Sequence, residues 1–313
     1  MINAMIPRIE EKNFRLEDNM ILVAGATGMV GFEICRLLAE KGKSVKAMVR
    51  TTSDSAKVNR LKSLGVKLVT CDLCDPETLK SACEDVEAVI CTISAMPFSY
   101  KPGVNDIQNV DLEGVKSLID AAKSAGVKHF IDVSFSKNLN SDFPLRNAKR
   151  AVEKHLMESG MIYTILRPSC FMEVWLGPAV GFDPANGKIT VYGTGDQLIG
   201  WISFKDVALF AVESLTNPAA RNKALELGGT LSLSYHQVIK IFEEVGKRTF
   251  EVTYVPREAL HQQVLAAQDP MQKSFAGLME CVSVGDPIEM TNTLKQFPLK
   301  LISVHDYAKS VMG

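Results

Sequence analysis

The sequence MILVAGATGMVG, residues 20–31, decides the fold of this chain. It opens with a short apolar run, which is typical of a buried parallel strand. Glycines then follow at Gly25, Gly28 and Gly31, and the chain continues into the amphipathic segment Phe32 to Lys41. A strand, a glycine-rich turn and a helix in this order predict a nucleotide-binding βα unit.

Each glycine of this turn has a separate predicted task. Gly25 permits the tight turn, Gly28 lets the backbone approach a pyrophosphate, and Gly31 lets the helix pack close to the strand. The helix N-terminus offers unpaired N–H groups and a partial positive charge to the phosphates. An ordinary βα turn is the alternative interpretation. The predicted contacts of the turn with a dinucleotide are Gly25, Thr27, Gly28, Met29, Val30 and Gly31.

The residue after the second predicted strand bears on cofactor choice. This strand runs from Ser44 to Val49 and is followed by Arg50. A site for NAD wants an acidic residue here, which binds the ribose 2′-hydroxyl. A guanidinium pairs bidentately with a 2′-phosphate and stacks on adenine instead. Arg50 therefore predicts NADP(H), with a surface arginine at a strand end as the alternative.

Composition excludes several classes of function. The chain has 313 residues, a formal charge of −1 and a pI of about 6.5, so nothing indicates a nucleic-acid partner. It contains no run of 18 apolar residues, so no membrane span is expected. Residues 1–19 are charged and fit neither a signal peptide nor a transit peptide. We expect them to form an extension over the surface of a cytoplasmic protein.

The seven cysteines do not form the pattern of a disulfide framework or a metal site. Cys71 and Cys74 make one C-x-x-C pair, but no second pair and no histidine lies near it in the sequence. The pair also follows a strand, whereas a redox-active pair favours a helix N-terminus. We therefore predict neither a bound metal nor a redox disulfide.

Strands and helices alternate along the chain. The remaining strands of the first part are predicted at 66–70, 86–93, 128–133 and 162–166, and a long helix at 106–125. This alternation predicts an α/β fold, a doubly wound parallel (Rossmann) sheet over residues 20–180. Residues 181–313 are predicted to form a smaller α+β substrate-binding region whose helices return to the core.

Two helices of that second region are predicted from local signals. Ser203 and Asp206 form an S-x-x-D capping box at the start of a helix that runs to Leu215, so we interpret Asp206 as structural. Periodicity predicts one long helix from Arg257 to Met279.

The glycine pattern G-A-T-G-x-x-G resembles that of the short-chain dehydrogenase/reductase superfamily. Lys149 stands four residues before Glu153, a K-x-x-x-E arrangement that aligns Lys149 with the superfamily's lysine. The superfamily's tyrosine would stand at Leu145, which has no titratable group. From Met20 to about residue 212 the chain resembles the atypical NmrA-like branch, which includes NADPH-dependent quinone reductases and NADP-sensing regulators.

The resemblance implies roles for further residues. Lys149 would anchor the nicotinamide ribose, although a lysine on a solvated helix face is the alternative, and Ser134 would orient a substrate carbonyl. The implied cofactor contacts are Asp72, Leu73, Thr92, Ser94, Lys149, Pro168, Cys170 and Phe171. The candidate walls of an apolar substrate site are Met96, Phe98, Tyr100, Met172 and Trp175.

Two functions fit these features, and the missing tyrosine counts against a third, an isomerase or epimerase on the same scaffold. The first is an NADP(H)-dependent oxidoreductase, a monomer or homodimer, that reduces a small quinone, carbonyl or related electron-poor substrate. Water or Ser134 would then supply the proton that the missing tyrosine cannot supply. The second is a non-catalytic NADP(H) sensor that acts through a protein partner.

Overall fold

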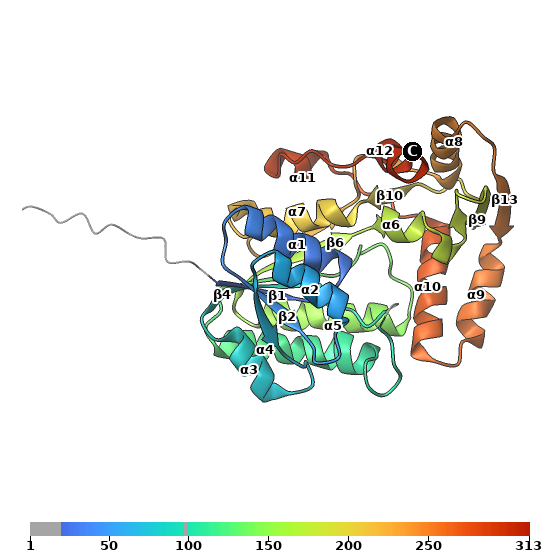
Figure 1. Cartoon of the computed structure of the whole chain (residues 1–313). Coiled ribbons are helices and arrows are strands. Elements are labelled where there is room, and N and C mark those ends of the chain that lie inside the picture. Colours follow the sequence, from blue (N-terminus) through green and yellow to red (C-terminus); the bar gives the residue numbers. More distant parts are fainter. Residues whose placement is uncertain (1–19, 97–98) are drawn as a thin grey trace, which may run out of the picture.

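The computed structural model describes residues 20–96 and 99–313. Its centre is a seven-stranded sheet in the order β11-β6-β5-β4-β1-β2-β3, with every pair of neighbours parallel (Figure 1). Its strands are β1 (Met20–Ala24), β2 (Val45–Val49), β3 (Lys67–Thr70), β4 (Val86–Cys91), β5 (His129–Val133), β6 (Ile162–Pro168) and β11 (Lys223–Leu227). The predicted doubly wound parallel sheet is thereby confirmed.

Helices cover both faces of the sheet. Apolar side chains of α1 (Met29–Glu40), α2 (Ser55–Ser63) and α7 (Phe204–Ser214) form the core on one face. Those of α3 (Pro76–Cys83), α4 (Val115–Ser124) and α5 (Pro144–Glu158) form the core on the other. Both faces are buried, which explains why the strands are almost continuously apolar.

The strand order reverses between β1 and β4. The connection from β1 leads to one side of the sheet, and the chain then crosses back to place β4 on the other side of β1. In sheets of this kind a ligand binds outside the carboxyl ends of the strands at this switch point. The predicted glycine turn follows β1 at that place.

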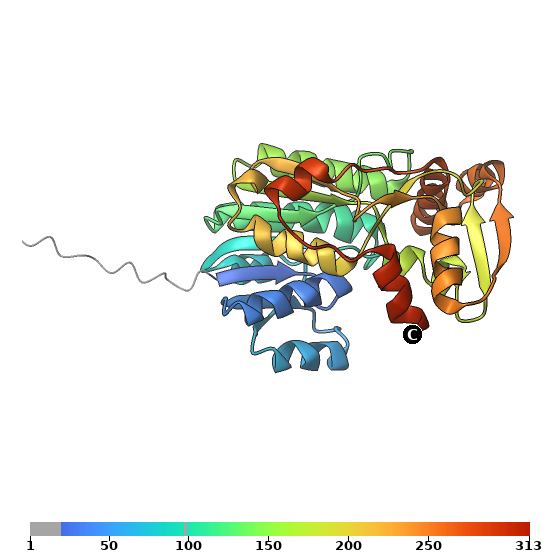
Figure 2. The ribbon, with the colours of Figure 1, turned by 90° about the horizontal axis from the view of Figure 1, so that it is seen from above.

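The second part of the chain adds two three-stranded sheets beside the carboxyl edge of the main sheet (Figure 2). One consists of β7 (Cys170–Phe171), β10 (Ile199–Ile202) and β12 (Ser232–Leu233), the other of β8 (Phe182–Asp183), β9 (Lys188–Tyr192) and β13 (Glu251–Val255). The helices here are α6 (Met172–Trp175), α8 (Tyr235–Gly246), α9 (Arg257–Ala266), α10 (Pro270–Val284), α11 (Thr291–Gln296) and α12 (Val304–Met312), with short 3-10 turns at Pro178–Val180 and Pro218–Ala220.

The two parts are not consecutive in the chain. β11 and α7 lie beyond residue 180, yet β11 completes the main sheet beside β6, and α7 packs on α1. The elements of the second part already begin with β7, before residue 180, and the main sheet is completed only by β11, after it.

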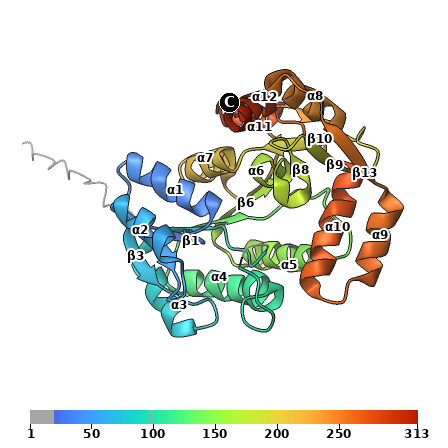
Figure 3. The ribbon, with the colours of Figure 1, turned by 45° about the vertical axis from the view of Figure 1, so that its right-hand side comes forward.

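Two predicted helices differ from the structure. The segment from Arg257 to Met279 forms two helices, α9 and α10, which run side by side (Figure 3). The break falls before Pro270. Proline has no backbone N–H to donate inside a helix, but it suits the first turn of a new one. Asp269 caps that new helix, α10. The predicted helix at 106–125 begins as a π-helix over Ile107–Gly114 before α4.

None of the helices in the described residues combines the length and the apolar character needed to cross a membrane. Residues 1–19, predicted to be a surface extension, and Phe98 lie outside the described residues.

Candidate functional site

The glycine turn packs so closely that side chains have no room at two of its positions. Gly25 has a φ of +83°, and a Cβ atom there would lie 2.6 Å from the Thr92 hydroxyl oxygen. A Cβ atom at Gly31 would overlap the carbonyl oxygen of Gly25. At Gly28 a Cβ atom would meet only the Gly25 carbonyl oxygen, at 3.2 Å. The turn is therefore tightly packed against the protein at Gly25 and Gly31, and it is less crowded at Gly28.

The N-terminus of α1 has the character of an anion site. Gly28 is its N-cap residue, no side chain caps it, and its first turn carries no acidic residue. Met29, in that first turn, is 40% exposed. Backbone N–H groups at an uncapped helix N-terminus bind phosphate, so the residues fit the pyrophosphate of a dinucleotide.

Arg50 lies at the carboxyl end of β2, next to the glycine turn in the sheet. Its side chain is exposed, and its Nη1 atom donates to the Asn105 side-chain oxygen at 2.5 Å. Asn105 belongs to the loop that follows β4, so this hydrogen bond links the carboxyl end of β2 to the loop after β4. Asp72, in contrast, accepts a hydrogen bond from the Cys74 N–H, and Leu73 is buried against Gly114.

Lys149 points into the protein rather than into solvent. It is 5% exposed, and its ammonium group donates to the Ile93 carbonyl oxygen at 2.8 Å. The Asp111 carboxylate lies 3.7 Å away. Burial by itself lowers the pKa of Lys149, but Asp111 and Asp132 outweigh burial and raise it. The alternative that Lys149 lies on a solvated helix face is therefore wrong. Its charged ammonium group is buried next to Ile93, just after the end of β4.

Asp111 is a residue of this cluster that the sequence analysis missed. It lies in the π-helix, is fully buried, and accepts a hydrogen bond from the Ala95 N–H at 3.0 Å. One signal was present, because Asp111 stands on the same helix face as Ile107 and Leu118, where only apolar residues are expected.

Asp132 lies deeper in the same cluster, on β5. It is paired with Cys91 of β4, and in the described part of the chain neither of its carboxylate oxygens has a hydrogen-bond partner. Burial raises the pKa of Asp132 to about 6, against the attraction of Lys149. The carboxyl ends of β4 and β5 thus enclose one lysine and two acids.

Ser134 belongs to a second buried network. Its hydroxyl donates to Glu153 at 2.6 Å, and Arg167 and Arg150 donate to the same carboxylate at 2.6 Å and 2.7 Å. Burial alone would raise the pKa of Glu153, but its hydrogen bonds from Arg167 and Ser134 hold it below its usual value. The Ser134 proton is directed at Glu153, not at the carboxyl edge.

The segment after β6 is held by a residue from far along the chain. The Asp286 carboxylate accepts hydrogen bonds from Ser136 at 2.7 Å, Asn138 at 2.8 Å and Ser169 at 2.6 Å. The sequence analysis missed Asp286, because its partners lie more than a hundred residues away. Beside it, Cys170 is 1% exposed, and burial raises the pKa of its thiol well above the usual value.

The predicted substrate residues separate into two groups. Met96 and Tyr100 pack on an apolar cluster that also contains Leu145 and Cys281. Met172 is fully buried in the core of the second part, where Trp175 is half-buried. Of the predicted cofactor contacts, Thr92 and Phe171 are half-buried and Ser94 is exposed. Pro168 ends β6 and is buried.

Leu145, at the position of the missing tyrosine, is covered by α10. It is 6% exposed, and its N–H donates to the Ser274 hydroxyl at 3.0 Å. The cluster around it includes Phe143, Ala148 and Cys281. A tyrosine here would overpack this core, so α10 occupies the space in which a tyrosine at this position would act.

The capping box predicted for α7 is only half right. Ser203 caps the helix by accepting from the Lys205 N–H, whereas Asp206 accepts from the Ile302 N–H at 3.0 Å. Its other carboxylate oxygen has no partner among the described residues. Asp206 is therefore structural, but it holds the segment before α12 rather than its own helix.

This position gives a pH-dependence that can be tested. Burial raises the pKa of Asp206 from 3.8 to about 7. The folded state then holds a proton that the unfolded chain releases, so stability falls as the pH rises through this range. Because asparagine keeps the acceptor for Ile302, Asp206→Asn should match the original stability near pH 4. We expect it to exceed that stability by about 4 kcal/mol at pH 8. Urea unfolding at the two pH values measures this difference, and a difference between the two proteins that does not change with pH would contradict the prediction.

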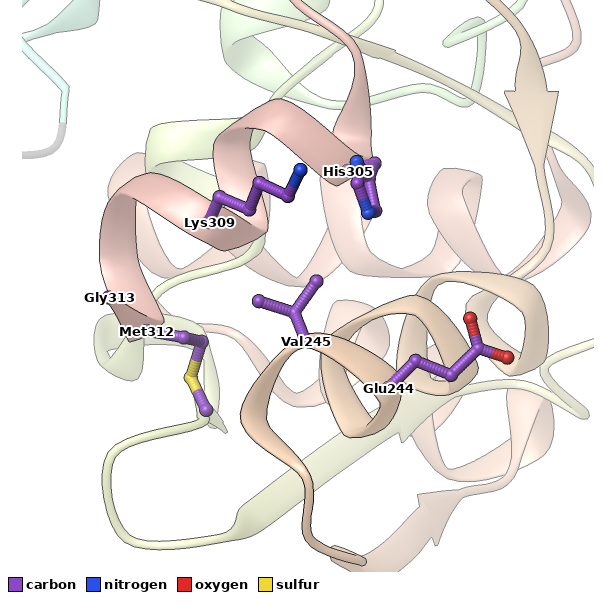
Figure 4. Close-up of a pocket in the computed structure, with 6 residues that line it drawn as sticks. All are labelled: Glu244, Val245, His305, Lys309, Met312 and Gly313. Atoms are coloured by element: carbon purple, nitrogen blue, oxygen red, sulfur yellow. The ribbon is translucent and has the colours of Figure 1, made fainter.

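A hollow elsewhere on the surface contains none of the predicted site residues. It lies between α8 and α12, where Lys309 and His305 point over Val245 (Figure 4). Its lining residues are Glu244, Val245, His305, Lys309, Met312 and Gly313. The glycine turn and Lys149 are not part of it.

Comparison with known proteins decides the family. The model of the NmrA-like family matches residues 17–308. The chain belongs to the NmrA-like family. An NAD(P)H azoreductase from Xenophilus azovorans is 31% identical over 282 residues, which cover 89% of this chain and 92% of that protein. The photosystem II assembly factor Ycf39 from Cyanophora paradoxa is 33% identical over 238 residues, which cover 75% of this chain and 71% of that protein.

Solved structures share the fold of this NmrA-like chain. The NADPH-dependent quinone oxidoreductase QOR2 from Escherichia coli, solved in complex with NADPH, has a TM-score of 0.74 at 22% identity. The match covers 94% of this chain and 100% of that one. An isoflavone reductase also reaches 0.74, at 23% identity, over 94% of this chain and 99% of that one.

Proposed function

We propose that this protein is an NADPH-dependent reductase of a small, electron-poor compound such as a quinone or a conjugated carbonyl. The observation that carries the proposal is the uncapped N-terminus of α1 behind a turn that only glycine fits at Gly25 and Gly31. A relative named as an NAD(P)H azoreductase supports the same chemistry, and a structural neighbour is named as an NADPH-dependent quinone oxidoreductase. The cofactor would supply the hydride.

The residues at the carboxyl edge divide the work of binding. The first turn of α1 takes the pyrophosphate, and Arg50 exchanges Asn105 for the 2′-phosphate. Lys149 uses one of its three donors on the Ile93 carbonyl oxygen. Its other donors would anchor the ribose and hold a proton for the substrate. Ser134 is a weaker donor, because its hydroxyl is engaged by Glu153.

The surroundings of Lys149 suit an apolar substrate. Met96, Tyr100 and Leu278 are partly buried and pack on the apolar cluster that contains Ala148, the residue next to Lys149. Such side chains exclude water and bind planar aromatic compounds. A quinone needs no strong acid, since its reduced oxygens are easily protonated.

The test is NADPH consumption by the purified protein with a panel of quinones, conjugated carbonyls and azo dyes. Calorimetry measures the affinity for NADPH in parallel. Turnover of any panel member supports the reductase, whereas a protein that does not bind NADPH contradicts the proposal.

A second candidate rests on the similarity to Ycf39. Under this proposal the protein binds NADP(H) without turning it over and acts by binding another protein. Tight NADPH binding without turnover on the whole panel would favour it over the reductase.

The cofactor preference is tested at Arg50. We expect Arg50→Asp to weaken NADPH binding roughly 10- to 100-fold, because a charged hydrogen-bonded pair is replaced by repulsion. NADH, which lacks the 2′-phosphate, should lose little. Arg60→Gln is the matched control, since the Arg60 guanidinium lies 4.2 Å from the centre of the Phe32 ring on a neighbouring helix. Calorimetric titrations that show an equal loss for both cofactors would contradict the role of Arg50.

A further inference from the structure

The Asp286 carboxylate is a junction of three loops. Among the residues that the structure describes, the side chains that donate to it are Ser136, Asn138 and Ser169, which are neutral, and the carboxylate is fully buried. A buried carboxylate is costly unless its oxygens are satisfied by hydrogen bonds. Because burying the Asp286 carboxylate is costly, we expect its three hydrogen bonds to serve a role.

The three donors lie on the loops that follow β5 and β6. Ser136 also donates its N–H to the Pro168 carbonyl oxygen at 2.9 Å, and Ser169 donates its N–H to Leu227 at 2.9 Å. The loop after β5 is therefore bonded directly to the end of β6 through Ser136 and Pro168. The Asp286 carboxylate links the two loops again, through the hydroxyls of Ser136 and Ser169. Without the carboxylate, the Ser169 side chain loses its partner.

The backbone of Asp286 is fixed in the second part of the molecule. Its N–H donates to the Leu198 carbonyl oxygen at 2.9 Å, and its own carbonyl oxygen accepts from Gly200 at 2.8 Å. Both partners belong to the start of β10 or the residue before it, and β10 pairs with β7. Asp286 thus connects the second part of the chain to the edge of the nucleotide-binding sheet.

The position of the junction relative to the glycine turn indicates what it serves. A dinucleotide lies across the switch point, with its pyrophosphate at the turn after β1. Arg50, after β2, marks the side of the adenosine half. The loops after β5 and β6 lie on the opposite side of β1. They therefore border the nicotinamide half.

We propose that Asp286 is a positioning residue that fixes the loop from Ser169 to Phe171 against the nicotinamide half of bound NADPH. This inference rests on the proposed function. Asp286 acts through Ser169, so it determines where the nicotinamide lies without contacting it. The adenosine half of the cofactor does not depend on it.

The experiment compares two ligands by calorimetry. NADPH contains both halves, whereas 2′,5′-ADP contains the adenosine 2′-phosphate and no nicotinamide. We expect Asp286→Ala and Ser169→Ala each to weaken NADPH binding about tenfold. Both variants should bind 2′,5′-ADP as the original chain does. Asn138→Ala is the matched control, because it removes a hydrogen bond to the same carboxylate from an exposed side chain.

Equal losses for the two ligands, or no loss for NADPH in Ser169→Ala, would overturn the assignment. If Asn138→Ala weakened NADPH binding as much as Ser169→Ala, the assignment would also be overturned. The affinity would then depend on any hydrogen bond to the Asp286 carboxylate and not on Ser169 in particular. Ser169→Ala decides the matter if Asp286→Ala does not fold. Failure of the original chain to bind NADPH would instead overturn the proposed function, and the assignment with it.

Discussion

Replacement of Gly31 by alanine is expected to abolish measurable NADPH binding, a loss of at least about 100-fold. The added methyl group overlaps the carbonyl oxygen of Gly25 and also presses on Ala26. The obstacle is backbone rather than a flexible side chain, so α1 must move away from β1. The N–H groups that would hold the pyrophosphate move with it.

The control for this variant is Gly246→Ala in α8. A methyl group there overlaps the end of the flexible Met312 side chain and makes only ordinary contacts with Arg248, so it tests the general effect of alanine in a helix. Calorimetry with NADPH and thermal unfolding are measured on both variants. A Gly31→Ala protein that binds NADPH normally would contradict the role of the turn.

Lys149→Met should have the second large effect, on stability and activity together. It removes the ammonium beside Asp111 and leaves a buried carboxylate without its cation, which costs about 3 kcal/mol. It also removes the group that would anchor the ribose and hold the proton, so turnover of any accepted quinone should fall at least about 100-fold.

The double variant Lys149→Met with Asp111→Asn separates these effects. Because it removes both charges, it should recover most of the lost free energy of unfolding while turnover stays low. Recovery of turnover together with stability would show that Lys149 is structural only. Lys154→Met, an exposed lysine on the same helix, should change neither quantity.

The features predicted from the sequence are those that local residues determine. The glycine turn and the extents of the strands depend mainly on neighbours within a few positions, and the structure has them close to the predicted places. The helix α1 begins at Met29, three residues before the predicted amphipathic segment. Lys149 lies on the buried face of its own helix with Leu145 and Val152, but that helix does not show which charge its ammonium group meets. That charge is on Asp111, which belongs to another element.

The parts that could not be predicted depend on contacts between distant residues. Ser134 was predicted to face a substrate, but its partner Glu153 lies on α5 and satisfies its hydroxyl. Asp286 resembles any loop aspartate in the sequence, and its role follows only from Ser136 and Ser169. The path of α10 over Leu145 likewise has no local signal, since it depends on how the second part packs on α5.

The late arrival of β11 has a consequence for synthesis on the ribosome. Until residues 223–227 have emerged, β6 forms the outer edge of the growing sheet. Its apolar residues Ile165 and Leu166 then lie on a strand with unpaired backbone groups, which is the type of edge that pairs with other chains. The nascent protein is therefore most prone to aggregate while the second part is being made, and β11 ends that period.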